Sequence, residues 1–549
     1  MANQVLNSTY GISYNVSGTS ATIGSKPEYG VLYFNADSNS TFESCTKLKV
    51  SLQDIADNFS MDPVVNASNM YSACYNLTGN PVCGDNVTNA RYMYYSCVRL
   101  TGSPVCGNNV TDAYGMYDDC YNLTGSPVCG NNVTNAFRMY QCCNNLTGSP
   151  VCGSNVINAS NMYNWCYRLT GSPVCGDNVT DASNMYNNCR WLAGPPVCGN
   201  NVTNASWMYG NCYNLIGPPV CENNVTDASY MYRFCYNLNG SPVCGNNVTN
   251  TERMYYECHN LTDSPVCGNN VIDASGMYQY CYNLNGSPVC GNNVIDASFM
   301  YYNCYRLAGP PVCGNNVTNA NSMYAYCNNL NGSPVCGNKV TNAHDMYAYC
   351  HNLTGSPVCG NNVIDASYMY YNCDNLAGPP VCGNKVIYAN HMYRNCYNLT
   401  GSPVCGSNVF YASSMYSHCN NLTGSPVCGS NVIDASYMYS YCSNLGINAT
   451  EIVPSGFTKV ANAAYMFSNC PNLTKEKNLQ LYLYSAKNCF AMLQDRPTGT
   501  KSITIITSNS NLDPLNSTIT NFLGEPITWD GTGTWIENTL YNISWYRDR

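Results

Sequence analysis

The chain has 549 residues, a net charge of −9 and only 10% charged residues. Its lysines and arginines form no basic stripe, which argues against a protein that binds the phosphate backbone of a nucleic acid. No apolar run approaches the ~20 residues that cross a bilayer, and we therefore expect no membrane span. The first residues, Met1-Ala2-Asn3-Gln4, have neither the basic start nor the apolar core of a secretory signal peptide.

Residues 1–38 precede any repeat and are predicted to form a small N-terminal β module. Two stretches within them, 10–16 and 29–34, alternate or cluster apolar residues between turn formers. This pattern is typical of short strands.

Residues 39–499 contain a sequence motif that repeats every 23 residues, and we call this motif the phrase. One cysteine of the phrase recurs at this interval from Cys74 to Cys442, and a second recurs from Cys83 to Cys428. A fixed period of this size indicates a solenoid, in which each rung buries its apolar residues against its neighbours. The less regular stretches before Cys74 and after Cys442 are expected to be degenerate caps.

The first half of the phrase matches the leucine-rich-repeat frame. Leu100, Ser103, Val105, Asn108 and Val110 fall at positions 1, 4, 6, 9 and 11, with serine in place of the second leucine. The frame predicts a short parallel strand with positions 4 and 6 in the core, and an asparagine at position 9 that turns inward. The proline at position 5 of every regular rung fits poorly, because proline cannot donate to a strand ladder. The predicted structural asparagine ladder comprises Asn108, Asn131, Asn200, Asn223, Asn246, Asn269, Asn292, Asn315, Asn338, Asn361 and Asn384.

The second half of the phrase has the spacing of a helix. Ala90, Met93, Cys97 and Leu100 are three, four and three residues apart, which places them on one helical face. An Asp or Asn such as Asp112 precedes this stripe, as a helix N-cap does. The cysteine of the stripe should then be buried and act as a small hydrophobic side chain. This predicted buried ladder includes Cys97, Cys120, Cys166, Cys189 and Cys258.

Together these features predict an α/β repeat solenoid of the leucine-rich-repeat type. Each 23-residue rung would contain a short parallel strand and a short helix. The phrase is absent from residues 500–549, where 502–506, 517–519 and 539–545 have the composition of strands. We therefore expect a small C-terminal β module, so that β modules flank the solenoid at both ends.

The cysteine that follows the strand valine, as in Cys106 and Cys129, is expected to face outward. Three states remain open for this series: reduced thiols, disulfides between neighbouring rungs, and a ladder that binds soft metal ions. Neighbouring strands lie about 4.8 Å apart, slightly more than the about 3.5–4.5 Å between the Cβ atoms of a disulfide.

The sequence predicts no enzyme, cofactor or metal site, because it contains no nucleophile motif, phosphate loop or cluster with metal-ligand spacing. The five histidines occupy variable positions and are interpreted as surface variation. Sequons such as Asn86-Val87-Thr88 are interpreted as by-products of the repeat, since glycans on every rung would collide.

One stretch resembles the BspA-like leucine-rich repeats of bacterial and protist surface proteins: Asn431-Val432-Ile433-Asp434-Ala435-Ser436-Tyr437-Met438-Tyr439, followed by Cys442 and Leu445. Units of that family carry N-V-T-x-M-x-x-M-F-x-x-C-x-x-L. This chain departs from them by alanine for the first methionine and by Gly-Ser-Pro-Val-Cys in the strand. The resemblance implies a surface protein that serves adhesion or recognition without catalysis.

Tyrosines that follow the helical cysteine should be exposed, and an exposed row of aromatic and amide side chains with little charge suits binding. We expect an extracellular surface or virion protein, a fibre or decoration, that recognises a host-surface glycan or protein and forms a homo-oligomer or joins a larger particle. The alternative is a structural spacer or self-assembling filament shaft. The candidate binding face comprises Tyr121, Tyr213, Tyr236, Tyr282, Tyr305, Trp207 and Tyr230.

Overall fold

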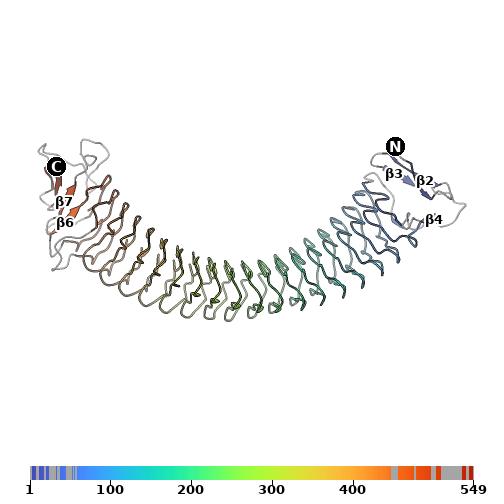
Figure 1. Ribbon diagram of the computed structural model, residues 1–549, viewed down its shortest axis with the longest axis horizontal. Helices are drawn as coiled ribbons and strands as arrows, with labels where there is room; N and C mark the ends of the chain where they lie inside the picture. Colours follow the sequence, from blue (N-terminus) through green and yellow to red (C-terminus); the bar gives the residue numbers. More distant parts are fainter. Residues whose placement is uncertain are drawn as a thin grey trace. The chain divides into compact units, whose positions relative to one another are not determined.

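The computed structural model describes residues 37–44, 52–53, 55, 59–446, 456–474 and 478–495, and the backbone of the terminal strands named below. The chain divides into two compact units, Met1–Val271 with Tyr280–Tyr282, and Ile272–Gln279 with Asn283–Arg549. Within each unit the repeat forms coils that lie side by side (Figure 1). The 23-residue period therefore corresponds to one coil of the chain.

The prediction of a helix in each rung is wrong: residues 61–446 contain no α-helix. The stretch with helical spacing is a run of overlapping turns. The N–H groups of Met116, Asp118 and Cys120 donate to the carbonyls three residues earlier, at 3.1 Å each. The N–H groups between them donate instead to the next coil, as from Tyr117 to the carbonyl of Met139 at 2.9 Å. Half of the donors thus leave the coil, whereas an α-helix keeps them within the segment.

Left-handed residues recur within each turn run. In one coil Gly115 has a φ of 55° and Asp119 a φ of 64°, and in the next coil Arg138 and Cys142 have φ values of 55° and 59°. Such φ values cost non-glycine residues free energy, so the neighbouring coil must hold them in place. We call this stretch, from the residue that follows the Asp, Asn or Tyr at the bridge to the residue that follows the buried cysteine of each coil, the turn run.

The predicted helix cap has a different role. Asp112 Oδ1 accepts a hydrogen bond from the N–H of Tyr114 at 3.1 Å, which opens the turn run in the manner of an Asx turn. The backbone of Asp112 also forms an isolated parallel bridge with Asn135 of the next coil. Bridges of this kind are the only β pairing between residues 61 and 446, so the predicted strand in each rung is also wrong.

The predicted leucine-rich frame is displaced by one residue in its strand half. Ser103 is exposed, Pro104 is buried and Val105 is half-buried, so the proline occupies the core position. The proline therefore disrupts no sheet, because no strand ladder exists there. The N–H of Val105 donates to the Tyr117 hydroxyl at 3.1 Å, and that hydroxyl donates back to the Val105 carbonyl at 2.6 Å.

Each coil closes around one set of fully buried side chains. In the coil of Tyr117 these are Val110, Ala113, Met116, Tyr117, Cys120 and Leu123. The irregular coils at the two ends of the repeat continue the set with phenylalanine, since the ring of Phe42 stacks on Tyr71 and that of Phe467 on Tyr439.

Short sheets form at the two ends of the chain. In the first unit β1 (Asn3–Asn7), β2 (Ile12–Ser17) and β3 (Ser20–Ile23) pair antiparallel, and β4 (Leu32–Tyr33) pairs parallel with β5 (Phe59–Ser60). In the second unit β6 (Leu479–Tyr482), β7 (Ile503–Thr507), β8 (Thr534–Asn538) and β9 (Ile543–Arg547) form one sheet in the order β6-β7-β9-β8.

This second sheet crosses the boundary expected at residue 500, because β6 pairs with β7. The strand expected at 517–519 lies outside the described residues. In the part of the chain that the structure describes, no helix has the length and apolar character needed to traverse a membrane.

Candidate binding face

The inner side of each turn run is fixed by a ladder of buried tyrosines. The rings of Tyr140 and Tyr163, one coil apart, have centroids 5.5 Å apart and planes 7° apart. The hydroxyls of the regular coils bond the backbone of the valine on the opposite wall, as Tyr140 does to Val128 and, in the second unit, Tyr324 does to Val312. Burial raises the pKa of these phenols well above the usual value, so they stay neutral.

Buried cysteines form a second ladder beside the tyrosines. The thiol of Cys120 donates to the carbonyl of Tyr94 in the preceding coil at 3.1 Å, and Cys166 donates to Tyr140 at 3.0 Å. Burial raises the pKa of these thiols well above the usual value. The structure buries all five cysteines that the sequence assigned to this ladder: Cys97, Cys120, Cys166, Cys189 and Cys258.

The outer side of the turn run differs from coil to coil. We call this surface the turn face; in one coil it consists of Arg91, Tyr92, Tyr95, Ser96 and Val98, all at least partly exposed. Residues at these positions include Asp, Asn, Ser, Phe, Tyr, Trp, His and Arg in other coils. Because the inner ladders set the spacing, side chains at one outer position in neighbouring coils lie next to each other.

One outer position carries a continuous column across six coils of the first unit. It is the position directly after the buried cysteine, and we call it the aromatic column. The Arg190 guanidinium lies 4.7 Å from the ring centre of Tyr167 and 5.6 Å from that of Tyr213. The column continues through Tyr236 and His259, with centroids 5.2 Å and then 5.0 Å apart, and ends at Tyr282, 4.7 Å from His259.

A second aromatic group surrounds Arg233 on the same face. Its guanidinium carbon lies 5.1 Å from the ring centre of Trp207 and 5.6 Å from that of Tyr230. The rings of Phe234 and Tyr256 lie 4.5 Å and 5.2 Å away. Trp207 and Tyr230 themselves stack at 4.5 Å with planes 5° apart. Cation–π contacts with four rings hold this arginine in place.

The residues predicted for the binding face fall into three sets. Tyr213, Tyr236 and Tyr282 belong to the aromatic column, and Trp207 and Tyr230 belong to the group around Arg233. The other two are more exposed, and Tyr121 donates its hydroxyl to Asp119 Oδ1 at 3.1 Å. The exposed fractions are 40% for Tyr121 and 41% for Tyr305, which lies in the second unit.

Sequence reasoning missed the members of the aromatic column that are not tyrosines. His259 was interpreted as surface variation, yet it continues the aromatic column between two tyrosines. Burial lowers the pKa of its imidazole, although the nearby Glu257 carboxylate opposes that effect. Arg190 was not singled out either, yet its guanidinium lies over the ring of Tyr167. The equivalent position in the preceding coil is Asn144, so the column begins at Tyr167.

The predicted asparagine ladder does not turn inward. Asn108, Asn131 and their counterparts through Asn384 are all exposed, which corrects the leucine-rich frame a second time. The side-chain ladder is formed by the next asparagine of the phrase, which is also on the surface. Asn155 Nδ2 donates to the carbonyl of Asn131 in the preceding coil at 2.9 Å, and Asn201 Nδ2 donates to that of Asp177 at 2.8 Å.

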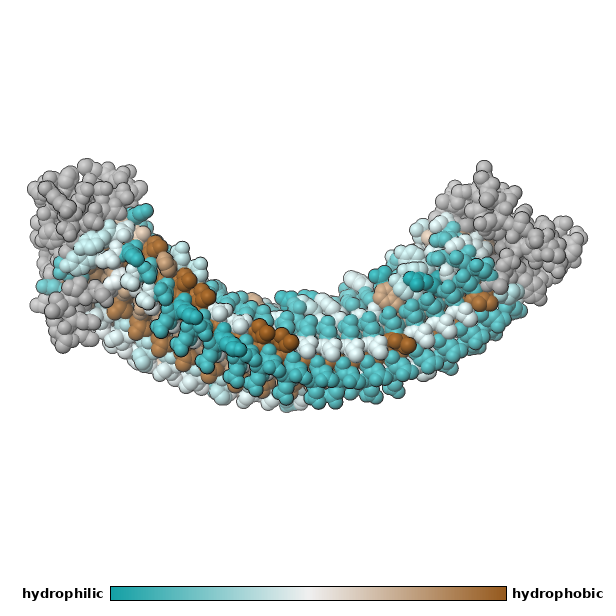
Figure 2. Space-filling view, in the orientation of Figure 1, coloured by the Kyte–Doolittle hydropathy of each residue, from teal (hydrophilic) through white to brown (hydrophobic). Residues whose placement is uncertain are grey.

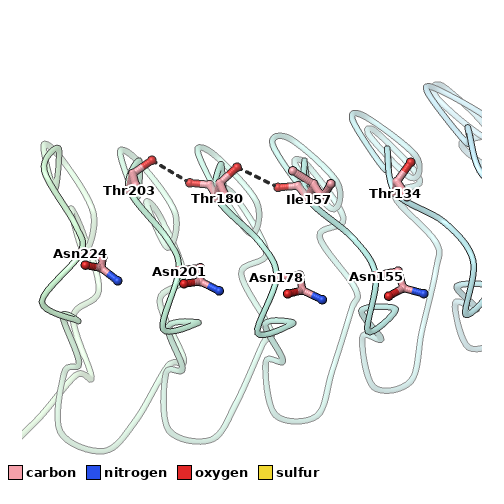
Figure 3. Close-up of a pocket in the computed structure, with 8 residues that line it drawn as sticks. All are labelled: Thr134, Asn155, Ile157, Asn178, Thr180, Asn201, Thr203 and Asn224. Atoms are coloured by element: carbon pink, nitrogen blue, oxygen red, sulfur yellow. Dashed lines mark hydrogen bonds between the residues drawn. The ribbon is translucent and has the colours of Figure 1, made fainter.

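This second surface is regular. Figure 3 shows Asn155, Asn178, Asn201 and Asn224 in one row, with Thr134, Ile157, Thr180 and Thr203 in a parallel row. The two rows line a shallow open groove. The Thr203 hydroxyl donates to the carbonyl of Thr180 at 3.1 Å, and the Thr180 hydroxyl donates to that of Ile157 at 3.3 Å. We call this surface the Asn/Thr face; its polar groups largely bond the neighbouring coil.

The cysteines that follow the valine are half-buried, and the last of them, Cys428, is buried, so the series does not face fully outward. A Cβ placed on Gly153 would lie 3.2 Å from the Cys129 sulfur and 2.8 Å from the Gly130 carbonyl oxygen of the preceding coil. The glycine therefore leaves room for the thiol beneath it. Cys129 forms no disulfide, and burial raises its pKa to about 12.

The two outer surfaces thus differ in kind. The Asn/Thr face keeps asparagine in most coils with threonine or isoleucine beside it, whereas the turn face changes in every coil and carries the aromatic groups. On the side drawn in Figure 2 the described surface is mainly hydrophilic, with hydrophobic residues in separate spots and short rows. Comparison with protein-family models, with curated proteins and with solved structures finds no match to this chain.

Proposed function

We propose that this chain is a non-enzymatic recognition protein that contacts its partner through the turn face. The observation that carries the proposal is the aromatic column from Tyr167 to Tyr282, which is half-exposed and already stacked. Aromatic residues and arginine are the side chains most enriched at the centres of protein interfaces. Because the column is ordered before binding, a partner would lose little side-chain entropy on contact with it.

The geometry favours a protein partner over stacked sugars. Each inner ring of the column has both faces covered by its neighbours, so the column presents ring edges and hydroxyl groups outward. Stacking of a sugar needs a free ring face, whereas tyrosine edges and hydroxyls suit a protein surface that offers both apolar and polar atoms. A partner that spans several coils would contact several members of the column at once.

The most numerous reactive side chains are poorly suited to catalysis. Cysteine acts as a nucleophile in its thiolate form, and burial raises the pKa of both cysteine series. The phenols of the tyrosine ladder are likewise kept neutral by burial, which raises their pKa. These features support a structural role for both groups, with the surface carrying the function.

The proposal includes a place on an extracellular surface or virus particle. Its support is the resemblance of the repeated phrase to BspA-like surface proteins, together with a turn face that differs from coil to coil. Surfaces that recognise partners can vary as long as the coil interior stays unchanged, and this chain has that distribution of variation.

The experiment is a paired substitution with a matched control on the other face. Tyr236→Asn and His259→Asn together break the aromatic column, and asparagine already occupies this position at Asn144, Asn328 and Asn420. The control pair is Thr180→Asn and Thr203→Asn on the Asn/Thr face. Labelled full-length protein is tested on intact candidate host cells, before and after protease treatment of the cells.

We expect the column variant to lose most of its binding and the control variant to keep it. Binding should also disappear when cell-surface proteins are removed by protease. Retained binding by the column variant would refute the turn face as the contact surface. Binding that survives protease but is lost after glycosidase treatment would instead assign the partner to the surface glycans.

A second candidate function is a structural spacer or filament shaft. The uniformity of the buried ladders and the recurrence of asparagine on the Asn/Thr face favour it, since a shaft needs uniform coils. Attachment would then lie at the ends of the chain. Deleting residues 500–549 would abolish assembly in this case while the column variant behaves like the wild type.

A further inference from the structure

Three side chains on the turn face form a group that the repeat does not explain. Asp118 and Asp119 lie in one coil and Cys142 in the next, and one ligand atom from each lies within 4.8 Å of the other two. Among the described residues this is the only such group of three His, Cys, Asp or Glu side chains. Cys142 is also outside both repeated cysteine series.

Asp118 is a buried carboxylate that lacks a full set of partners. Its exposed fraction is 2%, and its Oδ1 atom is buried without a hydrogen bond. Burying a charged oxygen in this way is costly unless a cation or a donor satisfies it. Burial, and then the adjacent Asp119 charge, raise the pKa of Asp118 to about 7.

Two further side chains lie beside Asp118, the thiol of Cys142 and the guanidinium of Arg138. Burial, followed by the charges of Asp119 and Asp118, raises the pKa of Cys142 to about 12. Arg138 is the nearby cation and favours the charged forms of both Asp118 and Cys142. Its Nε atom is nevertheless buried without a hydrogen bond, and its guanidinium lies 5.1 Å from the ring centre of Phe137. The arginine therefore leaves Asp118 Oδ1 unsatisfied.

We propose that Asp118, Asp119 and Cys142 bind a divalent cation of the zinc type and so join two consecutive coils. Zinc accepts both carboxylate oxygen and thiolate sulfur, whereas calcium and magnesium prefer oxygen alone. Binding releases the Cys142 proton to solvent as the sulfur–metal bond forms. The Tyr121 hydroxyl, which donates to Asp119 Oδ1 at 3.1 Å, helps to orient that carboxylate.

The repeat supplies variants that should fold. Asparagine stands at the position of Cys142 in Asn188 and Asn211, and at the position of Asp118 in Asn164 and Asn187. Cys142→Asn and Asp118→Asn therefore place a residue that other coils already accept. Cys129→Ser serves as the control, because it removes a half-buried thiol from the repeated series and leaves the three ligands intact.

Cobalt(II) is the probe, titrated into the full-length reduced protein, because a cobalt–thiolate bond gives a charge-transfer absorption that zinc then displaces. We expect this absorption, with one equivalent of cobalt, in the wild type and in Cys129→Ser, and its loss in Cys142→Asn. In Asp118→Asn the affinity for cobalt should fall by about tenfold or more, because losing a ligand costs at least as much as losing a group that supports one.

Equal absorption in the wild type and Cys142→Asn would overturn the proposal, because the metal would then be held by other cysteines. Absence of any absorption in the wild type would overturn it as well. Unchanged affinity in Asp118→Asn would remove Asp118 from the ligand set and with it the argument from its unsatisfied oxygen. No outcome depends on a binding partner, so this test is independent of the proposed function.

Discussion

Aromatic rings stack both in the buried interior of the coils and on their outer surface, and only the outer stacks vary in composition. The buried tyrosine ladder has ring centroids 5.5 Å apart in Tyr117 and Tyr140, and the outer aromatic column has 5.2 Å in Tyr213 and Tyr236. The coil repeat produces both spacings, because it places equivalent residues of neighbouring coils next to each other. Stacking alone is therefore no sign of function in this architecture.

What separates the two stacks is the role of the hydroxyl group. Tyrosine holds the ladder position from Tyr71 to Tyr439, and tyrosines such as Tyr117 bond a valine N–H and carbonyl across the coil. The outer column accepts arginine and histidine between its tyrosines, as at Arg190 and His259. The residue type is thus constant in the buried stack, which has a structural role. It varies from coil to coil on the surface that we assign to recognition.

The largest expected effect comes from removing one hydroxyl of the buried ladder. Tyr209→Phe deprives the Val197 N–H and carbonyl of their partner, at 3.1 Å and 2.6 Å. Because the valine is only half-buried and water can reach it in part, we expect a loss of about 1–2 kcal/mol in the free energy of unfolding. The measurement is the shift of the denaturant unfolding curve.

Tyr71→Phe is the matched control, since the Tyr71 hydroxyl is buried without a hydrogen-bond partner. Its removal should leave stability unchanged or raise it slightly. An equal loss in both variants would mean that the space filled by the buried hydroxyl, and not its bond to valine, makes tyrosine necessary in the ladder.

The sequence correctly predicts buried residues in the second half of the phrase, but the predicted secondary structure is wrong. Ala90, Met93, Cys97 and Leu100 are all buried, as their spacing indicates. Overlapping turns put the same residues on one side as a helix does, so the spacing could not separate the two. The two structures differ in their hydrogen bonds, because every second N–H group of the turn run donates to the next coil. The spacing of apolar residues within one coil gives no information about bonds to a neighbouring coil.

The candidate surface was predictable only in part. The position after the buried cysteine was recognised as exposed, which found Tyr213, Tyr236 and Tyr282. Arg190 and His259 were not recognised, because a search by charge and hydrophobicity places arginine and histidine in other classes than tyrosine. All three side chains nevertheless have a flat π system that can stack. Comparing each position down the coils, instead of along the chain, would have joined them into one column.

A second pair of substitutions tests the corrected register of the asparagines. Asn155→Ala removes an amide that donates to the carbonyl of Asn131 at 2.9 Å, and we expect a loss of about 0.5–1 kcal/mol in unfolding free energy. Asn131→Ala changes an exposed side chain and should stay within about 0.5 kcal/mol. A larger effect at Asn131 than at Asn155 would restore the inward asparagine of the leucine-rich frame.

The smallest expected effect is a dependence of stability on pH at His391, in the second unit. This ring stacks on Tyr368 at 4.5 Å, and its Nδ1 lies 3.4 Å from Nη1 of Arg394. Burial, followed by the Arg394 charge, lowers the pKa of His391 to about 4. Between about pH 4 and the usual histidine pKa of about 6.5, the unfolded chain therefore binds more protons than the folded chain.

The stability contributed by neutral His391 is accordingly full above about pH 6.5 and decreases as the pH falls toward 4. Because the ring is partly exposed and solvent screens its charge, we expect about 1 kcal/mol or less. His391→Asn should reduce the difference in unfolding midpoint between pH 7 and pH 4.5, and asparagine is accepted at this position in Asn161 and Asn184. Carboxylates titrate equally in both proteins, so the difference between the two pH profiles isolates the histidine. Identical profiles would show that a protonated His391 is tolerated beside Arg394. The turn face would then be more loosely packed around this ring than the stacking distance to Tyr368 suggests.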